Sequence, residues 1–355
     1  MIKEVSFPSA DGTLQLYGDL SLPKEEEEKS SLLLPAIVII NGSGPIDRHG
    51  NVPQMKLKLN TSNQIAKHMV ENRPNDRKTA VLSYDKRGVG KSINKKKKNG
   101  DNKNLFYRAG MMDFVLDAVE AVKFVCAHPR IDKDRIVLMG HSEGAIVLSL
   151  ICSEVNKAGL TPPIFGCIFY AGFGETLEEA MALQRENILA DVQAERGIKG
   201  FVLRRLITEE KLMKQHKDTM AKVHAEGDPE FISMSCGSVK LPAKWFREHM
   251  AFDAKNALKE HIICHCLAIT GQKDVQVHNE QCSPEKAAAL IPLAISIESH
   301  RPVNLTHALR SLDGQRSSIL NVKSDYARMG KLPLDQELLS ITDDWCDRRL
   351  FGSQS

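Results

Sequence analysis

The stretch that decides the fold of this chain is residues 136–148, which read IVLMGHSEGAIVL. Four apolar residues precede the pattern Gly140-His141-Ser142-Glu143-Gly144, and an apolar helical stretch follows it. A short apolar run with branched side chains is typical of a strand that is buried on both faces. The stretch therefore predicts a sharp turn from a buried strand into a helix, with a serine at the turn.

The chemistry of a nucleophilic serine explains this pattern. A tight strand-to-helix turn strains the backbone of the serine and projects its hydroxyl from the sheet edge, and glycine two positions to either side avoids collisions with the neighbouring chain. The first N–H groups of the new helix point at negative charge that develops in the reaction. We therefore predict that Ser142 is a catalytic nucleophile, and an ordinary glycine-rich turn is the alternative.

The rest of the chain alternates strand-like apolar runs with amphipathic helical stretches. Alternating residues around the turn signal Asp11-Gly12 predict an N-terminal hairpin. Buried strands are predicted at residues 35–40, 79–83, 135–139, 164–170, 262–270 and 293–297. Helices are predicted at residues 108–127, 144–155, 283–290 and 335–350. This alternation predicts an α/β fold, with a mostly parallel central sheet and helices on both of its faces.

One region interrupts the alternation. Residues 174–258 have no strong buried-strand run and are rich in Glu, Lys, Arg, Met and Ala, which predicts several inserted amphipathic helices. We therefore predict a first part of the core at residues 1–173, a helical cap at 174–258 and a second part of the core at 259–355. Some apolar residues of the cap are candidates either to line a lipophilic pocket or to pack on the sheet: Met181, Leu189, Phe201, Leu206, Met213 and Trp245.

A serine hydroxyl is a weak nucleophile, and it requires a base that an acid orients. In this architecture the three groups follow the order serine, acid, histidine, and the acid and the base each come after a later strand. Asp274 lies just past the strand that ends at Thr270, and His307 lies shortly after the last predicted strand. We predict Asp274 as the acid and His307 as the base, and we keep Glu175 as an alternative acid and His300 as an alternative base.

The reaction also requires hydrogen-bond donors for the oxyanion. The backbone N–H of Glu143, directly after the nucleophile, is predicted to be one donor. The other is assigned to Ser43, because the glycine-rich loop at residues 41–45 follows an earlier strand and its backbone can approach a substrate closely. A plain loop is the alternative interpretation of residues 41–45.

Composition limits the other classes of function. The chain has 355 residues and a net charge of +3, which is too balanced to indicate nucleic acid binding by charge alone. No apolar run approaches the roughly 20 residues of a membrane helix, and no secretory signal is visible at the N-terminus. The eight cysteines are expected to be free thiols, so we expect a cytoplasmic protein.

Four further segments have patterns that could indicate a function. Residues 88–92, Gly-Val-Gly-Lys-Ser, end like a phosphate-binding loop, but the full pattern requires glycine where Asp85 stands, so we do not expect nucleotide binding. Cys264-His265-Cys266 alternates across a strand, so we expect no metal site there. The runs Lys24–Ser30 and Lys95–Lys98 are expected to be exposed charged loops, with phosphate or membrane contact as the alternative for Lys95–Lys98.

Five ordered blocks of this sequence resemble those of α/β-hydrolases, in particular the esterase and serine aminopeptidase-like branch with a helical cap. The blocks are the oxyanion loop at 41–51, the Tyr-Asp-Lys-Arg-Gly-Val-Gly-Lys-Ser block at 84–92, the nucleophile turn at 140–144, the acid block at 271–277 and the base block at 304–307. The resemblance covers about residues 5–345 except the cap. It implies the α/β-hydrolase fold and a catalytic triad.

We therefore expect a serine hydrolase that cleaves carboxylic esters or thioesters through an acyl-enzyme on Ser142. A peptidase of the serine aminopeptidase type on the same residues, and a non-catalytic binding protein with the same fold, are the alternatives. The expected partner is a small-molecule ester, thioester or amide, with no nucleic acid and no membrane span. No metal or organic cofactor is expected, and the sequence leaves the oligomeric state open.

Overall fold

A computed structural model describes residues 1–23, 33–94, 105–161, 163–234, 239–312 and 317–352 of the protein. Its centre is an eight-stranded sheet in the order β1-β2-β4-β3-β5-β6-β9-β10. The strands are β1 (Ile2–Pro8), β2 (Gln15–Ser21), β3 (Leu34–Ile40), β4 (Ala80–Tyr84), β5 (Ile131–His141), β6 (Gly166–Tyr170), β9 (His265–Ile269) and β10 (Ser296–His300). The predicted charged loops Lys24–Ser30 and Lys95–Lys98 lie outside the described residues.

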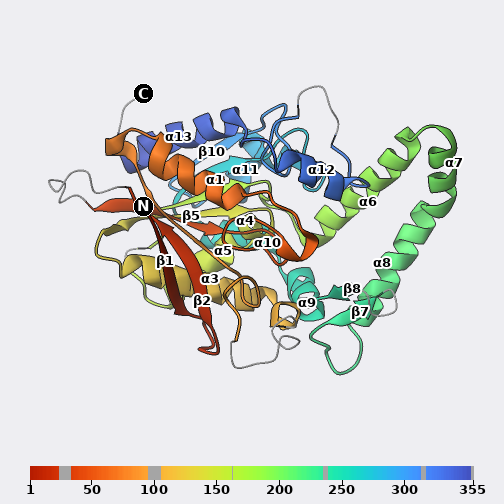
Figure 1. Ribbon diagram of the computed structural model, residues 1–355, viewed down its shortest axis with the longest axis horizontal. Helices are drawn as coiled ribbons and strands as arrows, with labels where there is room; N and C mark the ends of the chain where they lie inside the picture. The colour runs from red at the N-terminus through yellow and green to blue at the C-terminus, as the bar shows by residue number, and fades with distance from the viewer. Residues whose placement is uncertain (24–32, 95–104, 162, 235–238, 313–316, 353–355) are drawn as a thin grey trace.

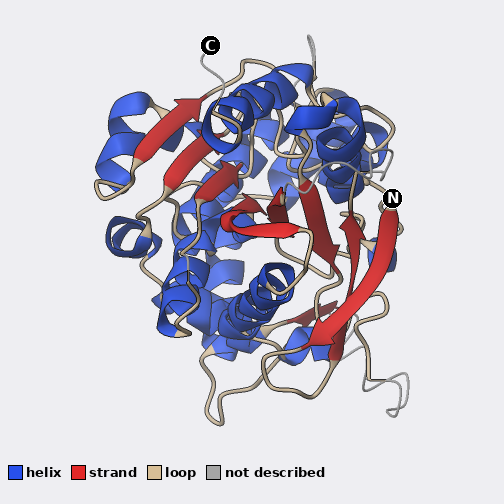
Figure 2. Cartoon of the chain, turned by 90° about the vertical axis from the view of Figure 1, so that its left-hand side faces the viewer, coloured by secondary structure: helices blue, strands red, loops and turns tan. Residues whose placement is uncertain are grey.

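The strand directions confirm the predicted sheet. The N-terminal hairpin β1–β2 is antiparallel and β2 joins β4 antiparallel, while the six strands from β4 to β10 run parallel. In the parallel pair β3–β5, Ile40 lies opposite Gly140, so the loops after these two strands leave the sheet side by side. Figure 2 shows the twisted sheet with helices on both sides, which is the predicted α/β fold.

The described helices lie on both faces of the sheet and in a segment that projects from it. They are α1 (Thr61–Lys67), α3 (Met111–Cys126), α4 (Glu143–Ile146), α5 (Leu148–Lys157), α6 (Leu177–Ala194), α7 (Gly197–Leu206), α8 (Glu209–Val223), α9 (Ala243–Ala251), α10 (Ala254–His261), α11 (Pro284–Leu290), α12 (Val322–Met329) and α13 (Gln336–Leu350). Residues from α3, α5, α10 and α11 form one buried apolar cluster with the sheet, and residues from α1 and α13 form a second cluster on the other face.

Strand β5 shows why a run of consecutive apolar residues suits this sheet. Ile136 and Leu138 belong to the first cluster, while Val137 and Met139 belong to the second. Successive side chains of a strand point to opposite faces, so a strand that is covered on both sides needs apolar residues at every position.

Two elements differ from their prediction. The last strand, predicted at 293–297, begins at Ser296, and it is half-buried because it pairs only with β9 at the sheet edge. Leu293 and Ile295 lie before it and are exposed. The helix predicted at 144–155 is divided at Val147 into α4 and α5. Apolar patterning alone did not reveal either the edge position or the break.

The inserted segment between β6 and β9 contains α6 to α9, α10, and a small hairpin of β7 (Ile232–Met234) and β8 (Val239–Leu241). The hairpin was not predicted, because strands of three residues give no readable alternation. Helices α6, α7 and α8 form an arm that projects from the sheet and its covering helices (Figure 1). No helix among the described residues is long and apolar enough to cross a membrane.

The two-sided burial of β5 gives a stability prediction. Ile136→Ala removes a fully buried side chain from the first apolar cluster, so we expect it to lower the free energy of unfolding by about 2–5 kcal/mol. The matched control Ile2→Ala truncates an exposed isoleucine of β1 and should change it by less than about 0.5 kcal/mol. Chemical denaturation measures both values, and equal losses would contradict this description of the core.

Candidate active site

Ser142 occupies a strained turn between β5 and α4. Its backbone has φ 56° and ψ −123°, a region that non-glycine residues rarely adopt. A Cβ at Gly140 would collide with the backbone of Gly144, and one at Gly144 would collide with the carbonyl of Ile40. The two glycines of the pattern are therefore required by close backbone approach, as the sequence indicated.

The structure brings Ser142, His307 and Asp274 together at the carboxyl ends of three parallel strands. His307 Nε2 lies 3.0 Å from Ser142 Oγ, and His307 Nδ1 lies 2.8 Å from Asp274 Oδ2. Ser142 follows β5, Asp274 follows β9 and His307 follows β10. All three residues lie at the predicted points of the topology, in a hydrogen-bonded chain.

The acid and the base are each fixed by further contacts. Backbone N–H groups of Gln276 and Val277 donate to Asp274 Oδ1 at 2.8 and 3.0 Å, which leaves Oδ2 to His307. His141 Nε2 donates to the backbone carbonyl of His307 at 2.8 Å. Desolvation, together with the nearby His307 ring, lowers the pKa of His141 to about 4, so this donor is uncharged at neutral pH. His141 thus holds the loop of His307 in place.

A buried arginine, which the sequence did not single out, supports the same loop. Arg310 donates from Nη1 to the carbonyl of Ala308 at 2.8 Å and from Nη2 to that of Leu59 at 2.7 Å. Its own carbonyl accepts from the backbone and the hydroxyl of Thr306 at 3.0 and 2.9 Å. Desolvation lowers the pKa of Arg310 to about 10, so the group keeps its charge at neutral pH. It ties the His307 loop to the segment before α1.

The predicted oxyanion loop passes beside the nucleophile. A Cβ at Gly42 would lie 3.0 Å from the Cβ of Ser142, and Lys86 Nζ donates to the carbonyl of Gly42 at 2.6 Å. Glu143 is the first residue of α4, where backbone N–H groups have no intrahelical partner. Ser43 is exposed in this loop, and its role as second donor remains a prediction.

The side chain of Glu143 is a feature that sequence reasoning missed. It is buried, and it accepts hydrogen bonds from Lys86 Nζ at 3.2 Å, from His249 Nε2 at 3.0 Å and from Trp245 Nε1. Burial by itself raises the pKa of Glu143, but the charge of Lys86 and the hydrogen bonds from His249 and Trp245 outweigh this effect and lower the pKa to about 2. Trp245 and His249 belong to α9, so this carboxylate joins the inserted segment to the turn at Ser142.

The alternatives from the sequence have other partners. The carboxylate of Glu175 accepts from His278, through both its ring Nδ1 and its backbone N–H, rather than from His307. His300 ends β10, where its carbonyl accepts from the backbone of Thr270 at 3.2 Å. The geometry therefore favours Asp274 and His307 as the acid and the base.

The segment that resembles a phosphate-binding loop has a structural role. Asp85 accepts from Arg48 Nη2 at 2.8 Å and from the backbone N–H of Lys91 at 2.9 Å. A side chain at Gly90 would collide with this carboxylate. Glycine at position 90 therefore allows the carboxylate of Asp85 to lie close to the turn.

The candidate pocket residues of the inserted segment fall into three groups. Phe201, Leu206 and Met213 are exposed on the arm, Met181 and Leu189 are half-buried on α6, and Trp245 contacts Glu143. A small cavity of about 20 Å³ lies beside Lys86 and Glu143. That volume suits about one water molecule. Among the described residues, no group of three or more His, Cys, Asp or Glu side chains could hold a metal ion.

A scan against protein-family models and a search of curated proteins find no match for this chain. Solved structures are similar to it along nearly its whole length. The Pyrococcus furiosus esterase Pf2001 has a TM-score of 0.52 and 15% identity, covering 98% of this chain and 90% of that one. The α/β hydrolase GrgF from Penicillium sp. sh18 has a TM-score of 0.50 and 14% identity, covering 99% of each chain.

A third similar structure belongs to a larger protein. The acylaminoacyl peptidase of Pyrococcus horikoshii has a TM-score of 0.52 and 14% identity. The match covers 100% of this chain and 42% of that one. At these identities the likeness concerns the fold. The chain therefore has the α/β-hydrolase fold, as the sequence blocks predicted.

The buried carboxylate of Glu143 gives a prediction about pH. Its pKa of about 2 in the folded protein lies below the ordinary value of 4.5, so its contribution to stability is full above pH 4.5 and is lost as the pH falls toward 2. Glu143→Gln should lower the free energy of unfolding at pH 7 by about 3 kcal/mol, because the variant also leaves Lys86 buried without its partner. The gap between the two proteins should shrink as the pH falls below 4.5.

Denaturation at several pH values measures this gap. The control Glu209→Gln changes an exposed carboxylate at the start of α8, and its gap from the wild type should stay near zero throughout. A gap for Glu143→Gln that does not change with pH would contradict the assignment of an ionised, stabilising carboxylate.

Proposed function

We propose that the protein is a serine hydrolase that cleaves carboxylic esters or thioesters, with Ser142 as nucleophile, His307 as base and Asp274 as orienting acid. The single observation that carries this proposal is the hydrogen-bonded chain from Ser142 Oγ through His307 to Asp274, with contacts of 3.0 and 2.8 Å. The first member of these hydrogen bonds, Ser142, lies on a strained strand-to-helix turn, which is where such a nucleophile is expected.

The reaction proceeds in two halves. His307 Nε2 accepts the proton of Ser142 Oγ as this oxygen attacks the carbonyl carbon, and the same nitrogen returns the proton to the leaving alcohol or thiol. The acyl group is then bound to Ser142. Water attacks this acyl-enzyme as His307 Nε2 accepts one of its protons, and His307 then gives this proton to Ser142 Oγ as the bond to the acyl carbon breaks and the carboxylic acid leaves. Asp274 holds His307 in the tautomer whose Nε2 can accept.

The oxyanion of each tetrahedral intermediate is assigned to the backbone N–H groups of Glu143 and Ser43. Two observations support this assignment. Gly42 passes so close to the nucleophile that a Cβ on it would lie 3.0 Å from Ser142 Cβ, and Lys86 donates to the carbonyl of Gly42 while it pairs with the side chain of Glu143. Lys86 thus links the two backbone segments that would supply the donors.

We also propose that residues 174–258 form a cap between the two parts of the core, 1–173 and 259–355. The contacts of Trp245 and His249 with Glu143 support a cap that reaches the site. Helix α10, at the end of this segment, packs against α5 and α11 and so connects the cap to the core.

An aminopeptidase on the same three residues is the second enzymatic candidate. It would need carboxylates aimed at the site to bind an α-ammonium group. The acidic side chains of the cap have other surroundings: Glu178 contacts Arg185 at 2.9 Å, Glu179 contacts Lys255, and Glu186, Glu209 and Glu210 are exposed. These contacts favour ester or thioester hydrolysis over the aminopeptidase activity. The remaining alternative is a non-catalytic binding protein, which the next experiment tests.

Substitution of the nucleophile tests the proposal. Ser142→Ala should remove detectable ester hydrolysis and labelling by a fluorophosphonate, since loss of such a serine lowers turnover by on the order of a million-fold. His307→Ala should have a similar effect on hydrolysis. Hydrolysis of a model ester and labelling seen on a gel measure the two activities.

Matched controls accompany these variants. Ser6→Ala changes an exposed serine of β1, and His300→Ala changes the alternative base, so both should keep nearly full activity. Unchanged labelling of Ser142→Ala would refute the nucleophile. Loss of activity in His300→Ala with retention in His307→Ala would move the base to His300.

Substrate comparison separates the two enzymatic candidates. Short- and medium-chain esters should have a much higher kcat/KM than aminoacyl amides at neutral pH. An alcohol is a better leaving group than an amine, and the carboxylates of the cap do not converge on the site to bind an α-ammonium group. The values come from initial rates over a series of acyl chain lengths. A higher kcat/KM for an aminoacyl amide, lost when its α-amine is blocked, would favour the peptidase.

A further inference from the structure

Helix α7 exposes a row of large apolar side chains. Ile198, Phe201, Val202 and Leu206 are 85%, 53%, 44% and 62% exposed. Their spacing of three and four residues places them on one side of the helix. An apolar stripe normally faces the interior of a protein, so this outward one requires an explanation.

The contacts of α7 fix which side faces outward. Gly200 is buried, and a side chain there would collide with the carbonyl of Glu195. On the same side, Arg204 Nη1 donates to the carbonyl of Glu195 at 2.9 Å. This inner side holds α7 against the end of α6, so the apolar stripe cannot turn inward without breaking these contacts.

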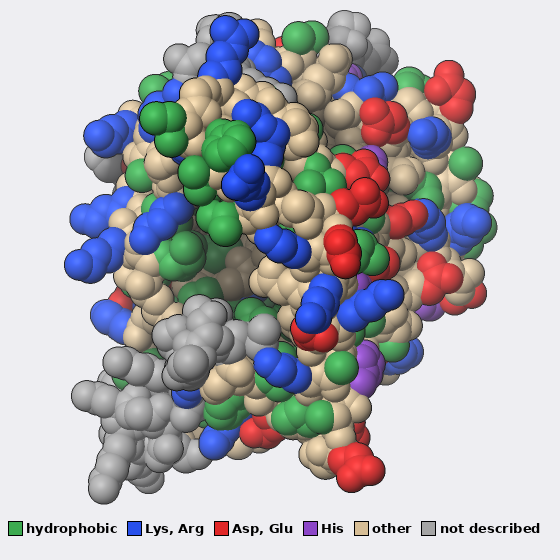
Figure 3. Space-filling view, turned by 90° about the vertical axis from the view of Figure 1, so that its right-hand side faces the viewer, with side chains coloured by type: hydrophobic (Ala, Val, Ile, Leu, Met, Phe, Trp, Pro, Cys, Tyr) green, Lys and Arg blue, Asp and Glu red, His purple; other side chains and the backbone are tan. Residues whose placement is uncertain are grey.

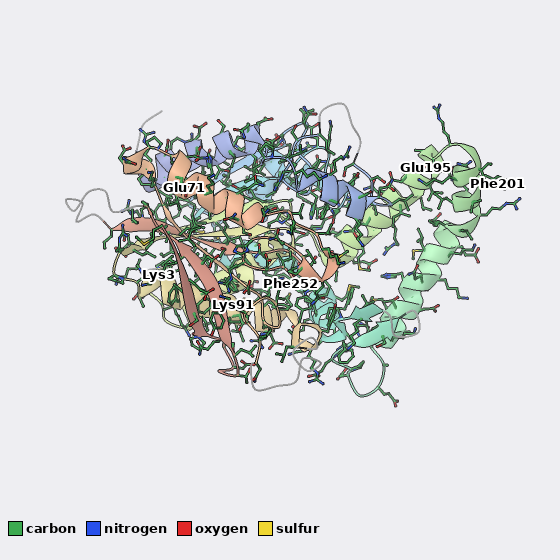
Figure 4. All side chains as sticks on the ribbon, in the orientation of Figure 1. Lys3, Glu71, Lys91, Glu195, Phe201 and Phe252 are labelled. Atoms are coloured by element: carbon green, nitrogen blue, oxygen red, sulfur yellow. The ribbon has the colours of Figure 1, made fainter. Side chains whose placement is uncertain are left out.

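The position of α7 in the molecule makes the stripe accessible. The helix lies at the far end of the arm, away from the sheet (Figure 1), and Phe201 lies at the outer edge of the molecule (Figure 4). Met213 on α8 adds an exposed apolar side chain near the start of the returning helix. The stripe therefore lies at the far end of the projecting arm.

Basic side chains surround the stripe. Residues 195–214 contain six Lys and Arg residues and three Glu residues, so this short segment carries a charge of +3, equal to that of the whole chain. Arg205 lies over the ring of Phe201 at 4.4 Å from its centre, and Lys199 is exposed beside Ile198, where it pairs with Glu195 at 2.7 Å. Figure 3 shows this side of the molecule, with apolar and basic side chains intermixed over one part of it.

We propose that the outer side of α7 docks on the surface of a bilayer that contains anionic phospholipids. The apolar side chains would enter the boundary between headgroups and acyl chains, while Lys199, Arg205 and the neighbouring basic residues contact lipid phosphates. A helix with an apolar stripe and a basic border binds membrane surfaces in this way, with the long basic side chains extending to the headgroups.

Two observations favour a bilayer over a second copy of the chain. A symmetric contact between two copies would bring two segments of charge +3 together, and like charges oppose such a contact. The stripe also lies on a single helix of 10 residues at the end of the arm, so it offers a rigid partner little area, whereas a bilayer deforms around it. The docking does not depend on the proposed hydrolysis, since Ser142 and its partners lie outside the arm.

Flotation of the full-length protein with lipid vesicles tests the proposal. The Ser142→Ala protein is used, so that hydrolysis plays no part in the readout. One set of vesicles contains phosphatidylcholine alone, and another contains phosphatidylcholine and phosphatidylserine in about a 3:1 ratio. The protein should float with the anionic vesicles at least about tenfold better than with the neutral ones, and added salt should weaken this binding.

Three double variants assign the binding to α7. Ile198→Ser with Phe201→Ser, and Lys199→Gln with Arg205→Gln, should each weaken binding to the anionic vesicles by about tenfold or more. The matched control Leu293→Ser with Ile295→Ser changes two exposed apolar residues of the turn before β10, and it should leave binding unchanged. All substituted side chains are exposed, so the fold should persist, and circular dichroism checks this.

Several results would overturn the proposal. They are no flotation with anionic vesicles, equal flotation with neutral ones, or equal loss in the control variant. Light scattering in the absence of lipid adds a further arm. A dimer that Ile198→Ser with Phe201→Ser abolishes, in a protein that does not float, would assign the stripe to a second copy of the chain.

Discussion

The close approach of two backbones at the turn after β5 is the constraint on which the site depends. The Cα of Gly144 faces the carbonyl of Ile40 so closely that no side chain fits between them, and Ser142 takes a strained conformation beside it. This approach exists because β3 and β5 are neighbours, with Ile40 opposite Gly140. The rigid apolar layers on both faces of the sheet hold the strain, which a loosely packed turn would release.

The buried ion pair between Lys86 and Glu143 connects the turn at Ser142 to α9, which lies outside the sheet. Lys86 and Glu143 are both buried, and removal of two charges from water is costly unless further polar contacts compensate for it. Here the carbonyl of Gly42 accepts from Lys86, and the side chains of Trp245 and His249 donate to Glu143. A helix that is far away in the sequence is thereby positioned against the nucleophile turn, and loss of either Lys86 or Glu143 would leave the other charge buried without its counter-ion.

The sequence predicted the parts of the molecule that rest on local patterns. The buried strands, the turn at Ser142 and the order of Asp274 and His307 follow from apolar runs, glycine spacing and chain topology. The partners of Glu143 and Arg310 did not follow, because a buried charge and a solvated one look alike in a sequence. The partly exposed strand at residues 296–300 was also misjudged, since an apolar run does not reveal how many neighbours a strand has.

The hydrogen bonds of Arg310 affect which residues of this chain can be substituted during evolution. Its guanidinium donates to the backbone carbonyls of Leu59, Ala308 and Leu332, rather than to acidic side chains. A carbonyl is present whatever the residue, so the three segments that it joins can exchange their side chains without loss of these bonds. These hydrogen bonds depend on the single residue Arg310, because a lysine has no planar group of donors that could reach three carbonyls in different directions. Related chains should therefore vary at positions 59, 308 and 332 while keeping arginine at position 310.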